Sequence, residues 1–499
     1  MNSVKKVLLF AMLFMSIVAV AQQENIFLDR SFWKSNPNLE TVKQKITEGN
    51  DATALNKNAF DAVIYALLEK ADDNAVKHLL SLEGNSVDKK THDSRIYLHW
   101  AAYAGQIEIV KYLLNNGSSV TELDSHGYTP LTFAANAGQK DKVLYETFEK
   151  YGINLLNEKN ENGANLLLLI AASLSNETEL NYFIGKGFKL NSKDDNGNGI
   201  FNYAAKKGNI DFLKLLVKKG VDYKTANNEG GNAILYASIG ARGSEYNIET
   251  FKYLESLGIK VDVVGDYGRN PLHRIAYNSN DVALFKYFMD KGVDINLQDN
   301  GGDSPFMNSA NSNTLEIVKL LFPKVKNINA EDENGRSALA MAVNRNTVEV
   351  VDFLLKNGAN ASIEDNKGNT LAYYLLNNWN EKDPSNFNAK LSLIKRAGVL
   401  MTQPQHDKNT LLHLAAKEND LALVKRISEF NIPVNKTNAE GYTALQIAAM
   451  KATDVAILKF LISKGADTKV KTDFEESVYD LASENELLQK QNTSLNFLK

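Results

Sequence analysis

The stretch HWAAYAGQIEIVKYLLNNG, residues 99–117, decides how this chain of 499 residues folds. Its first part is short, apolar and rich in alanine, and it ends at Gly105. From Ile107 to Leu114 apolar residues then recur at three- and four-residue spacing, which is typical of a helix with one buried face. Gly117 follows, as a glycine that ends a helix commonly does. The stretch therefore predicts two short helices, the first with side chains small enough for a neighbouring helix to approach closely.

The same succession of residues recurs along the body of the chain. Glycines that suit tight turns are separated by 36, 34, 33, 38, 34, 33, 33 and 73 residues, and the last interval covers two repeats with Lys408 in the place of the middle glycine. These glycines are Gly127, Gly163, Gly197, Gly230, Gly268, Gly302, Gly335, Gly368 and Gly441. A period of 33 residues with short insertions indicates a repeat architecture, in which stacked repeats share one continuous core.

Each repeat begins with a step that suits a helix N-terminus and continues, in many repeats, with a pair of alanines. Proline is tolerated in the first turn of a helix, and threonine, serine or asparagine beside it can cap free amides. The step occurs as Thr129-Pro130-Leu131, Asn270-Pro271-Leu272-His273, Ser304-Pro305-Phe306 and Thr443-Ala444-Leu445. The alanine pairs are Ala101-Ala102, Ala134-Ala135, Ala204-Ala205, Ala415-Ala416 and Ala448-Ala449. A second amphipathic helix and a closing glycine follow, as in residues 348–358.

In this order of motifs the chain resembles ankyrin repeats, in which two antiparallel helices are followed by a β-turn finger. Residues 99–117 and 441–467 are close to the family pattern, whereas residues 368–407 match it poorly. The resemblance implies a mainly α fold, an ankyrin-repeat solenoid of helix-turn-helix repeats with β-turn fingers, with eleven repeats over residues 94–473. We expect residues 22–93 to form two degenerate N-terminal repeats and residues 474–499 to form a C-terminal cap.

Residues 1–21 have the pattern of a secretory signal peptide. Lys5 and Lys6 precede a 14-residue apolar run, and small residues then mark a cleavage site between Ala21 and Gln22. The run is shorter than the roughly 20 apolar residues that span a bilayer, so an uncleaved anchor is the alternative and no membrane insertion is expected after cleavage. We predict an exported protein, in the periplasm of a Gram-negative bacterium or, as the second option, outside the cell.

The composition excludes several classes of chemistry. The chain has no cysteine, which rules out disulfides, thiolate metal sites and a cysteine nucleophile, and an exported chain of this kind fits a bacterial periplasm. Its 56 Lys and Arg against 60 Asp and Glu give a formal charge of −4, which becomes −4 − 2 = −6 when the signal peptide removes two lysines. This near balance argues against nucleic-acid binding, which depends on contacts between basic residues and phosphates.

The residues that could carry chemistry are explained by the repeat pattern. His99, His273 and His413 share one position of the repeat and lie several repeats apart, so they cannot converge on one metal; the resemblance implies that they bond to finger backbone. Residues 194–199, DDNGNG, match the start of an EF-hand calcium loop, but Ala205 stands where the loop needs a bidentate glutamate, which favours a turn. No phosphate-binding loop, zinc-protease motif or nucleophile elbow is present. We expect no catalytic residue, metal site or cofactor, and no enzyme activity.

Binding is expected where the fold leaves side chains free. The resemblance implies that finger tips and first helices form the concave side that meets partners, and Tyr and Arg are enriched among the residues that contribute most to binding. The positions beside each turn glycine and after each alanine pair give the candidates His126, Tyr128, Lys206, Lys207, Tyr267, Arg269, Tyr277, Arg336, Arg345, Tyr442, Met450 and Lys451. Two insertions, residues 240–247 and 378–389, are either part of a binding face or tolerated surface loops.

The function that these features favour is that of an exported, non-enzymatic scaffold, monomeric, which binds another protein through its concave ankyrin surface. One alternative is a secreted effector that acts on host or neighbouring cells. Another alternative is an enzyme or a ligand-binding receptor.

Overall fold

The computed structural model of the chain describes residues 25–241, 245–491 and 493–499. The expected signal peptide, with its cleavage site at Ala21 and Gln22, lies outside the described residues. The described residues form α-helices and short 3-10 helices joined by turns, and isolated β-bridges such as that between Glu331 and Ser337 mark the fingers. This confirms the predicted mainly α repeat fold. Contacts divide the chain into an N-terminal unit that ends at Thr225 and a C-terminal unit that begins at Ala226.

The N-terminal unit is a row of helix pairs. Its α-helices are α2 (Arg30–Lys34), α3 (Leu39–Thr47), α4 (Ala62–Leu68), α5 (Asp73–Leu80), α6 (Tyr97–Ala104), α7 (Ile107–Asn115), α8 (Pro130–Asn136), α9 (Lys142–Lys150), α10 (Leu166–Ile170), α11 (Glu177–Gly185), α12 (Ile200–Ala205) and α13 (Ile210–Lys218). Its 3-10 helices are η1 (Ile26–Leu28), η2 (His92–Ser94), η3 (Leu155–Asn157) and η4 (Ala171–Ser173).

The C-terminal unit continues the same pattern. Its α-helices are α14 (Ala233–Ile239), α15 (Ile248–Ser256), α16 (Pro271–Asn278), α17 (Val282–Asp290), α18 (Pro305–Ser312), α19 (Leu315–Leu321), α20 (Ala338–Arg345), α21 (Val348–Lys356), α22 (Leu371–Leu376), α23 (Ser385–Arg396), α24 (Leu411–Lys417), α25 (Leu421–Ser428), α26 (Ala444–Lys451), α27 (Ala456–Ser463), α28 (Val478–Glu484) and α29 (Glu486–Lys490). Its 3-10 helices are η5 (Asp266–Gly268), η6 (Phe322–Lys324), η7 (His406–Lys408) and η8 (Asn496–Leu498).

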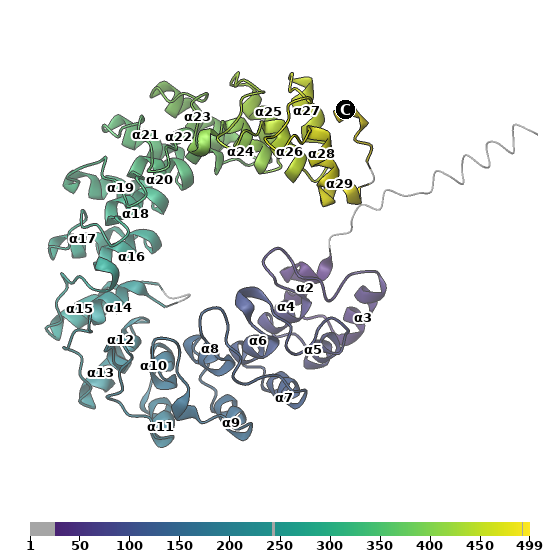
Figure 1. Cartoon of the computed structure of the whole chain (residues 1–499). Helices are drawn as coiled ribbons and strands as arrows, with labels where there is room; N and C mark the ends of the chain where they lie inside the picture. The colour runs from purple at the N-terminus through teal and green to yellow at the C-terminus, as the bar shows by residue number, and fades with distance from the viewer. Residues whose placement is uncertain (1–24, 242–244, 492) are drawn as a thin grey trace, which may run out of the picture. The chain divides into compact units, whose positions relative to one another are not determined.

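The helices of each unit lie in two rows (Figure 1). The even-numbered α-helices, here called the first helices, pack on one another, as α6 does on α8 and α18 on α20. The odd-numbered ones, the second helices, form the other row, in which α5 contacts α7 and α25 contacts α27. Within each unit, side chains between the two rows make the core, and Ala101 and Ala102 of α6 are completely buried in that of the N-terminal unit. Small residues are needed there because successive first helices pack closely.

The fingers are fixed by an aspartate or asparagine and a glycine in each turn. The carboxylate of Asp299 accepts hydrogen bonds from the amides of Gly301, at 2.9 Å, and Asp303, at 3.1 Å. Gly302 has a φ of +79°, and a β-carbon there would lie 2.6 Å from the amide nitrogen of Glu333 on the next finger. That amide donates to the carbonyl of Gly301 at 3.0 Å. Glycine is therefore required both by the backbone conformation and by the contact between successive fingers.

Lys408 takes the place of a turn glycine and adopts the same left-handed backbone, with a φ of 56°. Asp407 beside it has a φ of 55°, and its carbonyl accepts the amide of Ala439 on the following finger at 2.6 Å. A non-glycine residue pays a conformational cost in this region. The finger geometry therefore continues through the repeat whose sequence departs from the pattern.

The last helix pair covers the end of the C-terminal unit. Helix α28 packs on α26 and buries Val478, Leu481 and Ala482. The side-chain amide of Asn485 donates to the carbonyls of Ala449, at 3.0 Å, and Ala452, at 2.9 Å. These bonds satisfy carbonyls at the end of α26 that the helix itself leaves free.

Within the described segments, no helix has the length and hydrophobicity that a membrane crossing needs. Helix α23, for example, has 12 residues, whereas a spanning helix needs about 20.

Candidate functional site

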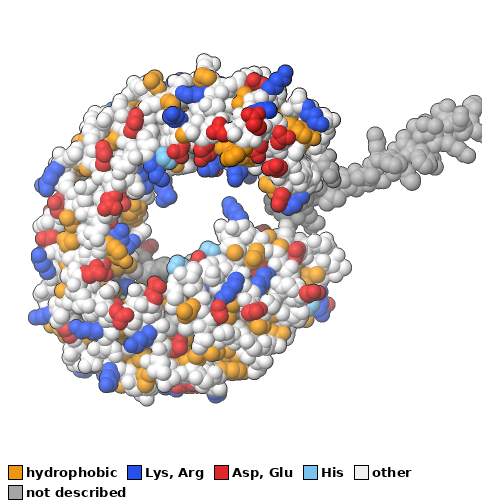
Figure 2. All heavy atoms as spheres, in the orientation of Figure 1, with side chains coloured by type: hydrophobic (Ala, Val, Ile, Leu, Met, Phe, Trp, Pro, Cys, Tyr) orange, Lys and Arg blue, Asp and Glu red, His pale blue; other side chains and the backbone are white. Residues whose placement is uncertain are grey.

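The candidate residues occupy two settings within the repeats. Six lie on fingers: His126, Tyr128, Tyr267, Arg269, Arg336 and Tyr442. The other six lie at, or just after, the C-terminal ends of first helices: Lys206, Lys207, Tyr277, Arg345, Met450 and Lys451. Basic, acidic and hydrophobic side chains are interspersed over the face of the molecule seen in Figure 2.

Residues from three successive repeats come together around Tyr277 of the C-terminal unit. The Tyr277 side chain is 41% exposed, and its hydroxyl accepts a 3.5 Å hydrogen bond from the side-chain amide of Asn311. Burial and the negative charge of Asp303 raise the pKa of Tyr277, so its hydroxyl remains a donor at neutral pH. The positive charges of Arg336 and Arg345 lower this pKa. Both guanidinium groups therefore lie within electrostatic range of the Tyr277 side chain.

The arginines of this region differ in their partners. Arg269 pairs with Asp299 at 2.8 Å and Arg336 pairs with Asp332 at 2.6 Å, and both carboxylates are almost completely buried. These two arginines are therefore positioned by groups that belong to the fold. Arg345 is exposed and has no ion pair among the described residues. Of these three candidate arginines, Arg345 is the one without a carboxylate partner among the described residues.

Tyr267 is the most exposed of the candidate tyrosines. It stands on a finger with a φ of 62°, in the left-handed region, and its side chain is 64% exposed. The guanidinium of Arg269 lies 5.3 Å from the centre of its ring, within the range of a cation–π contact. Arg269 thus joins the exposed ring of Tyr267 to the buried carboxylate of Asp299.

The finger residues of the N-terminal unit have a different environment. His126 is exposed, and its imidazole lies 3.4 Å from the carboxylate of Asp93 on the preceding finger. Tyr128 is half-buried, and its carbonyl oxygen is 3.0 Å from the Nε2 atom of His99. Of these two candidates, His126 is thus the more exposed.

The two candidate lysines after α12 also differ from each other. Lys206 lies with its ammonium group 4.7 Å from the centre of the Tyr203 ring, and burial lowers its pKa. Lys207 is exposed. Lys206 therefore contributes to packing on α12, while Lys207 is available at the surface.

Tyr442, Met450 and Lys451 lie on the finger and first helix of one repeat. Tyr442 and Met450 are half-buried, and Lys451 is exposed at the end of α26. The group around Tyr277 draws on α16, α18 and α20, so α22 and α24 separate it from α26. The structure does not gather all the candidates of this unit into one site.

Arg274 belongs to the first-helix surface but was not selected from the sequence. It is half-exposed, it has no ion pair among the residues described, and burial together with the nearby charge of Arg269 lowers its pKa. A signal was available, because Arg274 directly follows His273, the structural histidine of its repeat.

A row of aromatic side chains in the N-terminal unit was also missed. Phe133 of α8 stacks on Tyr103 of α6, with ring centres 5.4 Å apart, and meets Trp100 edge-on at 5.8 Å. The guanidinium of Arg95 lies 4.2 Å from the centre of the Phe133 ring. Trp100 and Tyr103 are three residues apart in the stretch 99–117, and this helical spacing is the signal that could have found them.

The three repeat histidines are structural. His99, His273 and His413 are buried on first helices, and each ring places Nε2 within 3.1 Å of a carbonyl oxygen on the following finger. His273 and His413 also complete capping boxes with Asn270 and Thr410. Burial lowers the pKa of all three, that of His99 to about 4.

The run of residues 194–199 is a finger turn. The carboxylate of Asp194 accepts hydrogen bonds from the amide of Asn198, at 2.8 Å, from its side-chain amide, and from the hydroxyl of Tyr203, at 2.7 Å. Protein donors thus occupy both carboxylate oxygens of Asp194, the first ligand position of the EF-hand pattern. Among the described residues, no group of three or more histidine, aspartate or glutamate side chains is arranged to hold a metal ion.

The fold and this surface define a helical-repeat solenoid. The family model for ankyrin repeats in three copies matches residues 33–120, 63–154, 168–265 and 272–365, and the model for ankyrin repeats in many copies matches residues 412–462. The chain belongs to the ankyrin repeat family. Ankyrin repeats imply a scaffold for protein–protein interaction.

Individual relatives match only parts of the chain. It is 44% identical over 69 residues to the 26S proteasome non-ATPase regulatory subunit 10 of Dictyostelium discoideum, which covers 14% of this chain and 30% of that protein. It is 31% identical over 154 residues to L-asparaginase of Dirofilaria immitis, which covers 30% of this chain and 25% of that protein. The chain thus spans less than a third of the length of these curated relatives.

A solved chain from the complex of a predatory endopeptidase of Bdellovibrio bacteriovorus with an immunity protein is 26% identical to this chain. The alignment covers 39% of this chain and 97% of that one, with a TM-score of 0.32. This likeness supports no conclusion about function.

The buried histidines predict that stability falls in acid. The pKa of His99 is about 4 in the folded chain against 6.5 in the unfolded chain. Protonation of His99 therefore leaves the free energy of unfolding unchanged above pH 6.5 and lowers it by roughly 3 kcal/mol as the pH drops to about 4. Gln446 occupies the same repeat position and completes a capping box with Thr443. The triple variant His99→Gln, His273→Gln and His413→Gln should therefore fold and lose part of this dependence. Thermal unfolding at pH 7, 6, 5 and 4 checks this, and an unchanged pH profile would contradict it.

Proposed function

We propose that this chain is an exported, non-enzymatic scaffold that binds a partner protein through its fingers and first helices. The group around Tyr277 carries the proposal. Its exposed ring lies within electrostatic range of the exposed Arg345, which has no ion pair among the described residues, and the two come from different repeats. Aromatic and arginine side chains of this kind supply most of the energy of protein interfaces. They are not required for stacking, which depends on the buried alanines and leucines.

We propose the following organisation for the chain: a signal peptide over residues 1–21, degenerate repeats over 22–93, eleven repeats over 94–473, and a cap over 474–499. The pattern of charged, apolar and small residues supports the first boundary. The helix pairs from α6 to α27, and the packing of α28 on α26, support the others.

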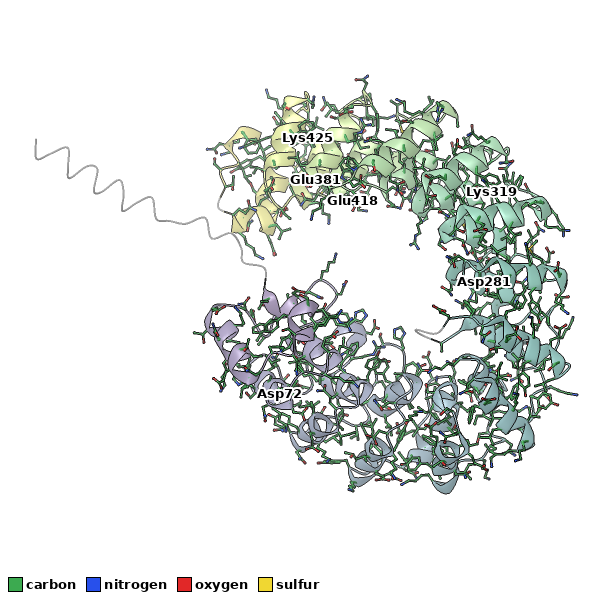
Figure 3. All side chains as sticks on the ribbon, turned by 180° about the vertical axis from the view of Figure 1, so that it is seen from behind. Asp72, Asp281, Lys319, Glu381, Glu418 and Lys425 are labelled. Atoms are coloured by element: carbon green, nitrogen blue, oxygen red, sulfur yellow. The ribbon has the colours of Figure 1, made fainter. Side chains whose placement is uncertain are left out.

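The proposed surface predicts a double variant that loses its partner. Mature chain immobilised on resin should retain one or more proteins from an envelope extract of its own organism, and Tyr277→Ala with Arg345→Ala should weaken retention about tenfold. The matched control is Lys319→Ala with Lys425→Ala, which removes two exposed cations from second helices (Figure 3). Quantitative mass spectrometry of the eluates measures the effect. Equal loss in both double variants would contradict a first-helix surface.

The proposed export predicts a processed chain outside the cytoplasm. We expect N-terminal sequencing of protein recovered from the periplasm to begin at Gln22, because the small residues before it form the cleavage site. Accumulation in the culture medium would instead favour a secreted effector that acts on host or neighbouring cells. Protein confined to the cytoplasm with Met1 intact would contradict both.

A further inference from the structure

The insertion at residues 378–389 builds a groove on the C-terminal unit. It lengthens the connection between α22 and α23 and places Trp379 beside the end of α24 and the start of α25. The groove between them has a volume of about 410 Å³. Leu376 and Leu414 contribute apolar walls, and Lys417 and Glu418 stand on its polar side.

The indole of Trp379 is held in place from two sides. Its N–H donates to the carboxylate of Asp420 at 2.8 Å, and the other oxygen of Asp420 caps α25 by accepting the amide of Leu423 at 2.9 Å. The ring of Phe387, which is completely buried, meets the indole edge-on, with ring centres 5.3 Å apart. A wall that is fixed before binding spares a ligand the entropy of ordering it.

The base of the insertion is anchored by a lysine that no solvent reaches. Lys390 donates hydrogen bonds to the carbonyl of Val343, at 3.0 Å, and to the side-chain oxygen of Asn378, at 2.6 Å. Burial lowers its pKa to about 8. Asn378 in turn donates to the carbonyl of Asn344 at 2.6 Å. The insertion is thus tied to the C-terminal end of α20, where a positive charge interacts favourably with the helix dipole.

The lining of the groove has two chemical parts. Leucines and the aromatic rings of Tyr373 and Trp379 offer hydrocarbon and π surface, while Glu418 offers a carboxylate and that of Asp420 is already bonded to Trp379 and Leu423. Arginine and lysine side chains have the same two parts, an apolar stem and a cationic head. Cations are attracted to the face of an indole, and the planar guanidinium of arginine can also stack on it.

The charges around the groove favour a cation. Among the residues that line the groove, the two carboxylates of Glu418 and Asp420 stand against one cation, Lys417, and the insertion also carries Glu381. Figure 3 shows Glu381 and Glu418 towards the first-helix side, and Lys425 farther out on a second helix. Glu418 is exposed and has no ion pair within the described part of the chain. Lys417 is exposed beside it and competes for the same carboxylate.

We propose that this groove binds one basic side chain of a partner protein, and arginine more tightly than lysine. The stem lies against the leucines and the Trp379 ring, and the head meets Glu418. The identity of the occupant as a protein segment rests on the proposed function. The groove itself is distinct from the surface around Tyr277 and can be tested without the partner.

Host–guest peptides of the form acetyl-Gly-Ser-Xaa-Ser-Gly-amide test the proposal with the full mature chain. Xaa is arginine, lysine, citrulline or glutamate, and citrulline has nearly the shape of arginine without its charge. Trp379 reports binding by its fluorescence, because Trp33 and Trp100, which complete the three tryptophans, are buried. We expect the arginine peptide to bind more tightly than the lysine peptide, and both more tightly than the citrulline and glutamate peptides.

Two neighbouring variants should change the arginine peptide's Kd in opposite directions. Glu418→Gln is expected to weaken binding about three- to fivefold, and Lys417→Gln to strengthen it by about twofold or more. Glu316→Gln, which removes an exposed acid on the second helix α19, is the matched control and should change nothing. Trp379→Leu, followed by calorimetry, should weaken binding about tenfold. If Trp379→Leu does not fold, the opposite changes in Kd expected for Glu418→Gln and Lys417→Gln still test the proposal.

Equal affinity for arginine and citrulline peptides would overturn the proposal, as would tighter binding of the glutamate peptide. An unchanged Kd for Glu418→Gln would also overturn it. If the groove binds arginine while Tyr277→Ala with Arg345→Ala retains the partner, the groove stands and the surface around Tyr277 fails. If that double variant loses the partner while no peptide binds, the groove fails and the proposed function stands.

Discussion

Close packing of successive first helices is the constraint on which the rest of the structure depends. One helix pair cannot bury its own apolar face, and only the next pair supplies the missing half of the core. The buried alanines at 101 and 102 keep the first helices near one another, and the finger bond from Glu333 to Gly301 repeats that proximity at the turns. Because each contact is local, an insertion such as 378–389 can be added to one repeat without disturbing the others.

This constraint separates residues that hold the repeats together from residues that are free to bind. Buried histidines, turn glycines and capping residues are fixed by contacts with the next repeat. Tyr277 and Arg345 lie at the ends of first helices with their side chains exposed, and Tyr277 meets the next repeat only through the long hydrogen bond from Asn311. Adjacent first helices bring such ends into one surface although they are about 33 residues apart in sequence. A repeat protein can therefore change its binding surface while keeping its core, as side chains at these ends vary.

Much of the fold could be predicted from the sequence because its signals are local. The period of the glycines, the helix-capping steps and the role of His99 all depend on residues within one repeat or its immediate neighbour. The site could be predicted only in part. Arg336 and Arg345 were found with Tyr277, whereas the contacts of the aromatic row at Phe133 depend on how neighbouring repeats meet. The contact between Trp379 and Asp420 joins residues 41 positions apart across an insertion, and no pattern in the sequence specifies it.

The central claim is that a partner protein meets the fingers and first helices. Hydrogen–deuterium exchange of the mature chain, alone and with its captured partner, tests this most directly because it locates contact along the whole chain. Slower exchange is expected at the ends of first helices and at fingers, including the peptides that contain Tyr277 and Arg345. Slower exchange confined to the second helices, with those peptides unchanged, would contradict the claim.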